Sequence, residues 1–319
     1  MDATTHQPVM CDEIVDLFAP VPAGVVVDAT YGRGGHAAAI VRSHPHLRVV
    51  AVDRDPAAVR AAAELRSREP ALAGRLSVHH ARFDQVASVL EALGVREISG
   101  ALFDLGVSSP QLDDATRGFS YRHDGPLDMR MDPASPLSAG DVVNDYDEAR
   151  LADVIRANSD ERFARRIARA IVARRPVRST LELAEIVTSA IPAPARRTGG
   201  HPAKRTFQAL RIEVNGELDA LEGAVAWALE ATVPGGRVAV LAYHSGEDRI
   251  VKRVFRAAER GPAGGPASPY VHEDRPTGGI VRRLRVPKHP SEAEQAGNPR
   301  SRSARLRAVE RCEPAAVVA

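Results

Sequence analysis

The sequence predicts a doubly wound α/β fold, because short runs of apolar, β-branched residues alternate with helical segments over residues 24–104. Three of these runs end at an acidic residue, namely Asp28, Asp53 and Asp104. The chain has 319 residues, of which 44% are hydrophobic and 26% are charged. This composition is typical of a soluble globular protein that buries a core without disulfides or structural metal.

The individual elements follow from the same patterns. Continuous apolar runs predict buried strands, and Pro56 stands where the first turn of a helix tolerates proline. The expected strands are 25–27, 48–52, 76–79, 98–103 and 236–242. The expected helices are 36–42, 56–66, 148–157, 160–174, 180–190, 203–230 and 247–259.

The middle of the chain differs in character from both ends. Residues 105–140 are rich in Gly, Pro, Ser and Asp, and their apolar residues follow neither the period of a helix nor that of a strand. We therefore expect a long ordered loop, a feature that is usually functional. Helical segments follow up to about residue 230 before the sheet resumes. We therefore expect one α/β domain, residues 1–112 and 213–319, interrupted by a helical, substrate-recognising insertion at residues 113–212.

Several classes of protein are excluded. The two cysteines, Cys11 and Cys312, cannot form a disulfide framework or a Cys-rich zinc site, and no cluster has metal-ligand spacing. The first twenty residues lack the apolar run of a signal peptide, and no stretch is apolar enough to span a membrane. We therefore expect a cytoplasmic protein without metal or membrane partners, and a homodimer remains open.

The net charge of +2 hides two basic blocks. Residues 160–212 hold twelve Lys and Arg against four Asp and Glu, and residues 281–311 hold nine against three. Basic blocks on a chain that is otherwise acidic indicate a polyanionic partner such as nucleic acid. The alternative is that these arginines only form solvated helix faces.

A glycine-rich turn, Gly32-Arg33-Gly34-Gly35, lies between the first strand and the first helix. Glycines let the backbone approach a ligand, and the helix start offers free N–H groups. Asp53 ends the next strand, where a carboxylate can bind both hydroxyls of a ribose. The GxGG spacing is not the GxGxxG of dinucleotide sites, which favours an adenosine ligand without a pyrophosphate, such as S-adenosylmethionine. Alternatively, Asp53 only caps the following helix.

Three more residues are candidates at this edge of the sheet. Asp104 ends the fourth strand, where open α/β sheets bind ligands. Phe83 is either a contact for an adenine ring or a core aromatic residue, and His36 is either a cofactor contact or a structural histidine.

Seven sequence blocks resemble the bacterial 16S rRNA (cytosine-N4)-methyltransferases of the RsmH (MraW) family over nearly the full length. The blocks are HQPVM at 6–10, DATYGRGGH at 28–36 with DRDP at 53–56, DLGVSSPQLDDATRGFSYRHDGPLDMRMD at 104–132, SDERFARRIARAIV at 159–172, HPAKRTFQALRIEVNGEL at 201–218, YHSGEDRIVKRVF at 243–255 and NPRSRSARLRAVER at 298–311. Two residues depart from the family's FHSLEDR block: Tyr243 replaces Phe, and Gly246 replaces Leu. The second departure loosens a turn and does not touch the chemistry.

The resemblance implies a class I S-adenosylmethionine-dependent methyltransferase with a Rossmann-like sheet and a helical insertion. It also implies methylation of N4 of the decoding-site cytidine, position 1402, of 16S rRNA in the 30S ribosomal subunit. The cofactor contacts that it implies are Gly34, Gly35, His36, Asp53, Phe83, Asp104 and Gln111. Only Gln111 comes from the resemblance alone.

Further residues are predicted to take part in catalysis and in RNA binding. We expect Asp104 to orient the amine as a hydrogen-bond acceptor, with Asp124 and Asp128 as weaker candidates. The alternative for Asp128 is a packing role through pairs with Arg130 and Arg117. The expected phosphate contacts are Arg165, Arg166, Arg169, Lys204 and Arg205.

Three alternatives stay open at this point. The first three of those arginines could instead pair with Asp160 and Glu161 along their helix face. A nicotinamide oxidoreductase fits the fold class but not the glycine loop. An rRNA assembly factor without chemistry fits the charge blocks alone.

Overall fold

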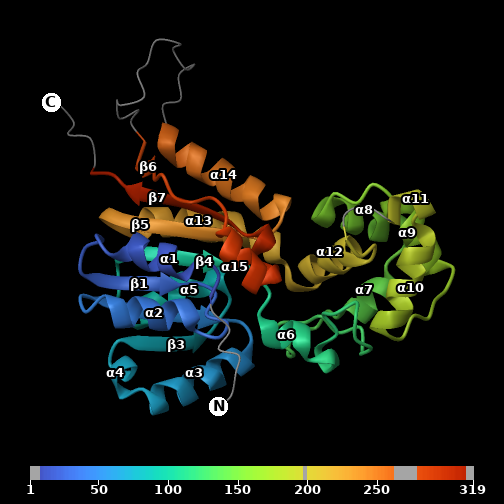
Figure 1. The fold of residues 1–319 in the computed structure, drawn as a ribbon, viewed down its shortest axis with the longest axis horizontal. Coiled ribbons are helices and arrows are strands. Elements are labelled where there is room, and N and C mark those ends of the chain that lie inside the picture. The colour runs from blue at the N-terminus through green and yellow to red at the C-terminus, as the bar shows by residue number, and fades with distance from the viewer. Residues whose placement is uncertain (1–7, 197–199, 262–278, 314–319) are drawn as a thin grey trace, which may run out of the picture. The chain divides into compact units, whose positions relative to one another are not determined.

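The computed structural model describes residues 8–196, 200–261 and 279–313. The start of the HQPVM block therefore lies outside the described residues. The chain divides into an α/β unit, residues 1–106 with 219–319, and a helical unit, residues 107–218 (Figure 1). The helical unit thus begins before residue 113 and ends after residue 212, the limits expected for the insertion.

A seven-stranded sheet runs through the α/β unit in the order β3-β2-β1-β4-β5-β7-β6. Strands β1 to β5 are parallel, and β7 runs antiparallel to both of its neighbours. The strands are β1 (Gly24–Asp28), β2 (Leu47–Asp53), β3 (Leu76–His80), β4 (Ile98–Asp104), β5 (Thr232–Ala242), β6 (Val281–Arg283) and β7 (Arg305–Arg311). The predicted doubly wound α/β class is confirmed.

Strands β6 and β7 were not expected from the sequence. In β7, charged and apolar residues alternate over most of the strand, and Leu306, Ala308 and Val309 are buried. The surplus of arginine made this segment look like a solvated basic tail. The period of two in Arg305-Leu306-Arg307-Ala308 is the signal that identifies the strand.

Helices cover both faces of the sheet. One core cluster joins α1, α2 and α3 to one face, and a second joins α5, α13 and α14 to the other. The helices of this unit are α1 (Cys11–Phe18), α2 (Gly35–Ser43), α3 (Pro56–Arg68), α4 (Pro70–Ala73), α5 (Val86–Ala92), α13 (Glu217–Ala231), α14 (Ser245–Arg260) and α15 (Glu292–Gly297), with the 3-10 turns η1 (Phe83–Gln85) and η3 (Pro299–Ser303). Burial on both faces explains the long apolar runs of β1, β2 and β4, whereas the edge strand β3 carries Ser77, His79 and His80.

The helical unit has a core of its own, and every member of that cluster belongs to residues 107–218. Its elements are α6 (Ser109–Asp113), η2 (Ala115–Arg117), α7 (Ala139–Asp145), α8 (Glu148–Ser159), α9 (Ala164–Val172), α10 (Thr180–Ala190), α11 (Ala193–Arg196) and α12 (Lys204–Asn215). The helix expected over 203–230 was wrong, because Gly216 adopts a left-handed conformation (φ 56°) and separates α12 from α13.

The expected long ordered loop is largely present between η2 and α7, and side chains hold it. The buried Asn215 amide donates to the carbonyls of Met129 and Arg211 at 2.8 Å, and its oxygen accepts from the Met131 amide at 2.9 Å. Arg117 donates to the carbonyls of Arg130 and Met131. The loop backbone is therefore fixed by polar contacts rather than by secondary structure.

Candidate cofactor and catalytic site

The chain leaves β1 at the point where its two neighbouring strands diverge. The Ala29 amide donates to Leu102 of β4, and the Tyr31 amide donates to Val52 of β2. The loop from β1 to α2 therefore starts where the strand order reverses, which is where open α/β sheets bind ligands.

The glycine loop after β1 leaves no room for side chains on its inner side. Gly34 has φ 74°, and a Cβ there would lie 2.2 Å from the Tyr31 hydroxyl. A Cβ on Gly35 would lie 2.4 Å from Cγ of Pro8. Tyr31 and Pro8 therefore pack closely against the loop backbone. Helix α2 begins directly after the loop, and the N–H groups of its first turn have no partner within the helix.

Asp53 fixes the same loop from the end of β2. Its Oδ2 accepts a hydrogen bond from the Gly32 amide at 2.6 Å, and its Oδ1 accepts from the Asp55 amide at 2.8 Å. Burial raises the pKa of Asp53, although these two amides oppose that shift. Helix α3 is capped by Asp55 and not by Asp53, since the Asp55 side chain accepts from the Ala57 amide. The alternative of Asp53 as the helix cap was therefore wrong.

His36 and Asp104 face each other across the site. His36 Nε2 lies 3.5 Å from Asp104 Oδ2, too far for a well-formed hydrogen bond. Both ring nitrogens are buried and make no hydrogen bond of normal geometry within the described residues. Burial alone would lower the pKa of His36, but Asp104, Cys11 and Asp28 outweigh it and raise it to about 9. The ring is therefore positively charged at neutral pH.

Asp28 completes an acidic cluster at the end of β1. Its carboxylate is 2% exposed and accepts from the Thr30 amide at 3.1 Å. Burial raises its pKa to about 7, and the nearby carboxylates of Asp104 and Asp53 add to the shift, while His36 opposes it. Asp28 and Asp104 thus lie beside the charged His36 ring, and Asp53 lies near Asp28, so the site suits a ligand that carries positive charge.

The backbone around Asp104 is held from two sides. Its amide donates to the Thr30 hydroxyl at 2.7 Å, and its Oδ1 accepts from the Gly106 amide at 3.2 Å. Tyr243 packs close to Gly106, and burial together with the Asp104 charge raises the pKa of its phenol. The hydroxyl that distinguishes Tyr243 from the family's Phe therefore lies in the field of Asp104. Gly246 lies in the first turn of α14.

The two remaining cofactor candidates lie in different units. Phe83 is half-buried and packs edge-on against Phe103, with ring centroids 6.3 Å apart. Gln111 belongs to the helical unit, where its side-chain oxygen accepts from the Ser108 amide at 3.2 Å and caps α6. Both stay predictions as cofactor contacts.

The weaker catalytic candidates have structural partners in the helical unit. Asp128 forms a two-pronged pair with Arg130, at 2.9 and 2.8 Å, and this pair outweighs burial in lowering its pKa. The exposed Asp124 accepts from the Leu181 amide at 3.4 Å, and hydrogen bonds led by that from Ser179 lower its pKa. Both carboxylates tie the long loop together, which is the packing role considered for Asp128.

The five candidate RNA contacts are exposed on α9 and α12. Arg169 pairs with Glu148 at 3.5 Å, and Arg205 lies 3.8 Å from Glu161. Arg165, Arg166 and Lys204 form no ion pair within the described residues. The alternative in which Arg165, Arg166 and Arg169 pair with Asp160 and Glu161 is not what the structure shows.

Sequence reasoning missed Asp248 of α14. Its carboxylate is 3% exposed and contacts three cations, with Lys252 at 3.0 Å, Arg305 at 3.2 Å and Arg307 closest. These cations outweigh burial and hold its pKa at about 2. The spacing of Asp248 and Lys252, four residues apart on one helix, was the available signal.

Among the described residues, no group of His, Cys, Asp or Glu could hold a metal ion, and no helix is long and apolar enough to cross a membrane.

Comparison with known proteins identifies the family of the chain. The model of the MraW methylase family matches residues 3–312. The ribosomal RNA small subunit methyltransferase H of Acidothermus cellulolyticus is 51% identical over 97% of this chain and 94% of its own length. The proteins of that name from Thermobifida fusca and Mycobacterium tuberculosis are 49% and 51% identical, over 97% of this chain and 94% and 80% of their own lengths.

A solved rRNA methylase from Streptococcus thermophilus is also similar, with a TM-score of 0.43 and 12% identity over 97% of this chain and 100% of that one. This likeness is weak, and the fold assignment is based on the strand order of the sheet.

Proposed function

Because the chain belongs to the MraW methylase family, we propose that it transfers the methyl group of S-adenosylmethionine to N4 of the decoding-site cytidine, position 1402, of 16S rRNA in the 30S subunit. The observation that carries the proposal is the acidic cluster of Asp28, Asp53 and Asp104 beside the glycine loop. A cluster of this charge and position fits a sulfonium cofactor with an adenosine moiety.

Three residues of the α/β unit, Asp53, His36 and Tyr31, fit such a ligand. Asp53 already orients the glycine loop and retains lone pairs for ribose hydroxyls. The buried nitrogens of His36 and the Tyr31 hydroxyl make no well-formed hydrogen bond among the described residues, although His36 Nε2 lies 3.5 Å from Asp104. Buried polar groups in that state are unusual and favour a ligand that supplies the missing hydrogen bonds.

When bound, S-adenosylmethionine supplies a methyl group that is already activated by the sulfonium charge. The cytosine amine is a poor nucleophile, because its lone pair is delocalised into the ring. The protein therefore has to place the amine in line and accept its hydrogens, which is mainly a positioning effect.

Asp104 is suited to this task, since His36 and the Gly106 amide fix its orientation and its side chain is 22% exposed. In this transfer the bond from the sulfur to the methyl group would break, a neutral thioether would leave, and N4 would lose one proton as its own bond to the methyl group forms. A carboxylate of Asp104 hydrogen-bonded to the amine would direct the lone pair and lead that proton toward water. The target base has to be splayed out of its stack to reach this point.

A methyl-transfer assay tests the proposal. The protein is incubated with labelled S-adenosylmethionine and 30S particles that lack the modification, and the label is mapped by nuclease digestion and mass spectrometry. We expect up to one methyl group per particle, on N4 of a single cytidine. Labelling of another nucleotide, or binding of NAD in preference to S-adenosylmethionine, would contradict the proposal. Particle binding without transfer would favour the assembly factor.

A further inference from the structure

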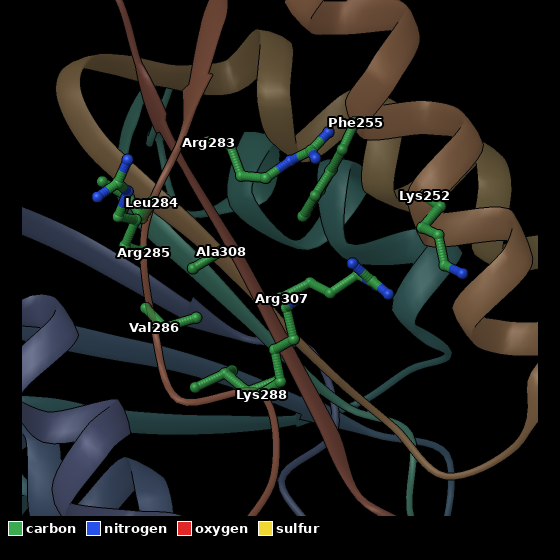
Figure 2. A pocket seen from close by; sticks show the side chains of 10 residues that line it. Lys252, Phe255, Arg283, Leu284, Arg285, Val286, Lys288, Arg307 and Ala308 are labelled. Carbon is green, nitrogen blue, oxygen red and sulfur yellow. The ribbon is translucent and has the colours of Figure 1, made fainter.

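A groove in the α/β unit lies away from the glycine loop, between α14, β7 and residues 283–288 (Figure 2). Its volume is about 300 Å³, at the lower limit of pockets that bind small groups. Its floor is apolar and includes the buried residues Phe255, Leu306 and Ala308. Its polar lining consists of Lys252, Arg283, Arg285, Lys288 and Arg307, with no acidic residue.

Internal ion pairs do not use up this positive charge. Asp248 is shared by Lys252, Arg305 and Arg307, and Arg283 pairs with Glu259. Two carboxylates thus serve four cations. Arg285 and Lys288 are exposed and form no ion pair within the described residues. Since structural pairing accounts for the inner cations but not for these two, the outer pair is available to a partner.

The inner cations are also held in place. Asp248 of α14 forms ion pairs with Lys252 of the same helix and with Arg307 of β7. Figure 2 shows the Arg307 side chain reaching from β7 toward α14. A positively charged surface that is fixed before binding loses little side-chain entropy when a ligand arrives. Side chains anchored in this way are suited to phosphate recognition, for which arginine offers paired donors.

Strand register places the groove at the same sheet edge as the candidate catalytic residue. Asp104 of β4 pairs with Leu241 of β5, and Leu241 pairs with Leu306 of β7. Neighbouring strands are about 4.8 Å apart, so the backbone of Leu306 lies roughly 10 Å from that of Asp104. A nucleic acid whose reacting base is at Asp104 would carry its neighbouring phosphates over this distance.

We propose that this groove binds the phosphate backbone of the RNA next to the target nucleotide, with Arg285 and Lys288 as direct phosphate contacts. The inference builds on the proposed function, since it takes RNA to be the substrate. It adds a second contact surface, on the α/β unit, to the arginines expected on α9 and α12. An apolar floor with a cationic rim suits a nucleotide, which presents a sugar or base beside its phosphate.

The test compares the double variant Arg285→Ala/Lys288→Ala with a control, Arg60→Ala/Arg96→Ala. The control removes the same charge from two exposed arginines of the same unit that have no ion pair within the described residues. Affinity for 30S particles is measured by filter binding against salt, with S-adenosylhomocysteine present. Methyl transfer at saturating particles and calorimetric cofactor affinity are measured in parallel.

We expect the groove variant to bind particles about tenfold more weakly at low salt, with a salt slope shallower by about one unit per lost contact. The maximal rate and the cofactor affinity should match the wild type, and Arg285→Lys/Lys288→Arg should restore binding. A groove variant whose affinity and slope equal those of the control would overturn the inference. If the wild type binds particles but transfers no methyl group, the proposed function fails while the binding comparison still decides on the groove.

Discussion

At the scale of single residues, Asp53 has two tasks. Its carboxylate holds the Gly32 amide and is also the expected ribose contact. We expect Asp53→Ala to weaken S-adenosylmethionine binding by roughly 1–3 kcal/mol, because donors of the ligand lose their acceptor. Isothermal calorimetry measures this loss.

The control is Asp55→Ala, which removes the N-terminal cap of helix α3. This variant should have a lower melting temperature and an unchanged affinity for S-adenosylmethionine. Wild-type affinity in Asp53→Ala would refute the ribose contact.

Asp28 predicts a pH dependence of cofactor binding. Its pKa in the folded protein is about 7, well above its ordinary value of 3.8, so its ionisation costs stability as the pH rises from about 4 to about 7. If S-adenosylmethionine binds as proposed, the same ionisation adds a negative charge near its sulfonium. Affinity for S-adenosylmethionine should therefore rise between pH 6 and pH 8, by up to about tenfold.

The comparison of ligands and variants isolates this effect. His36, with a pKa of about 9, stays charged over the window and does not contribute. S-adenosylhomocysteine has no sulfonium charge and should show a smaller rise, and Asp28→Asn should remove the rise altogether. An equally steep profile in Asp28→Asn would assign the titration to another group.

At the scale of secondary-structure elements, α9 and α12 carry the exposed basic side chains that we expect to contact RNA. Replacing Lys204 and Arg205 by Ala should reduce methylation of 30S particles and make the salt slope shallower by about one unit per lost contact. The folded unit should tolerate the change, since the Arg205–Glu161 pair spans 3.8 Å and Arg205 is 57% exposed. Cofactor affinity is the internal control. A normal rate and an unchanged slope would remove these helices from the RNA surface.

The sequence predicted those elements whose hydrophobic pattern is explained by burial alone. Strands β1, β2 and β4 contain long buried apolar runs because helices cover both of their faces. Strand β7 was missed because its arginines have partners far away in sequence, such as Asp248 for Arg307. The break at Gly216 was missed because one glycine inside a helical pattern looks tolerable until its φ is known.

The same distinction applies to the candidate site. Gly34, Gly35, Asp53 and Asp104 could be chosen from local spacing, since each stands at the end of a strand or the start of a helix. The charge on His36 and the raised pKa of Asp28 depend on which carboxylates the fold brings together. That information is absent from any single stretch of the chain.

At the scale of the whole molecule, the helical unit should fold by itself. All members of its core, among them the fully buried Leu210, lie within residues 107–218. We expect these residues, expressed alone, to show a helical circular dichroism spectrum and a cooperative thermal transition. Leu210→Ala should destabilise the isolated unit by about 2–5 kcal/mol. A spectrum without a cooperative transition would show that the unit depends on the rest of the chain.

The position of β7 between β5 and β6 has a consequence for biosynthesis. Strand β6 pairs with β7 and with no other named strand, and the last cations around Asp248 come from β7 itself. A nascent chain that has reached residue 260 can assemble the parallel strands, yet it leaves the outer edge of β5 unpaired and Asp248 short of Arg305 and Arg307. Since unpaired strand edges invite aggregation, this edge is the vulnerable feature of the growing chain. Residues 305–311 close that edge, so the edge of β5 stays open until β7 has been synthesised.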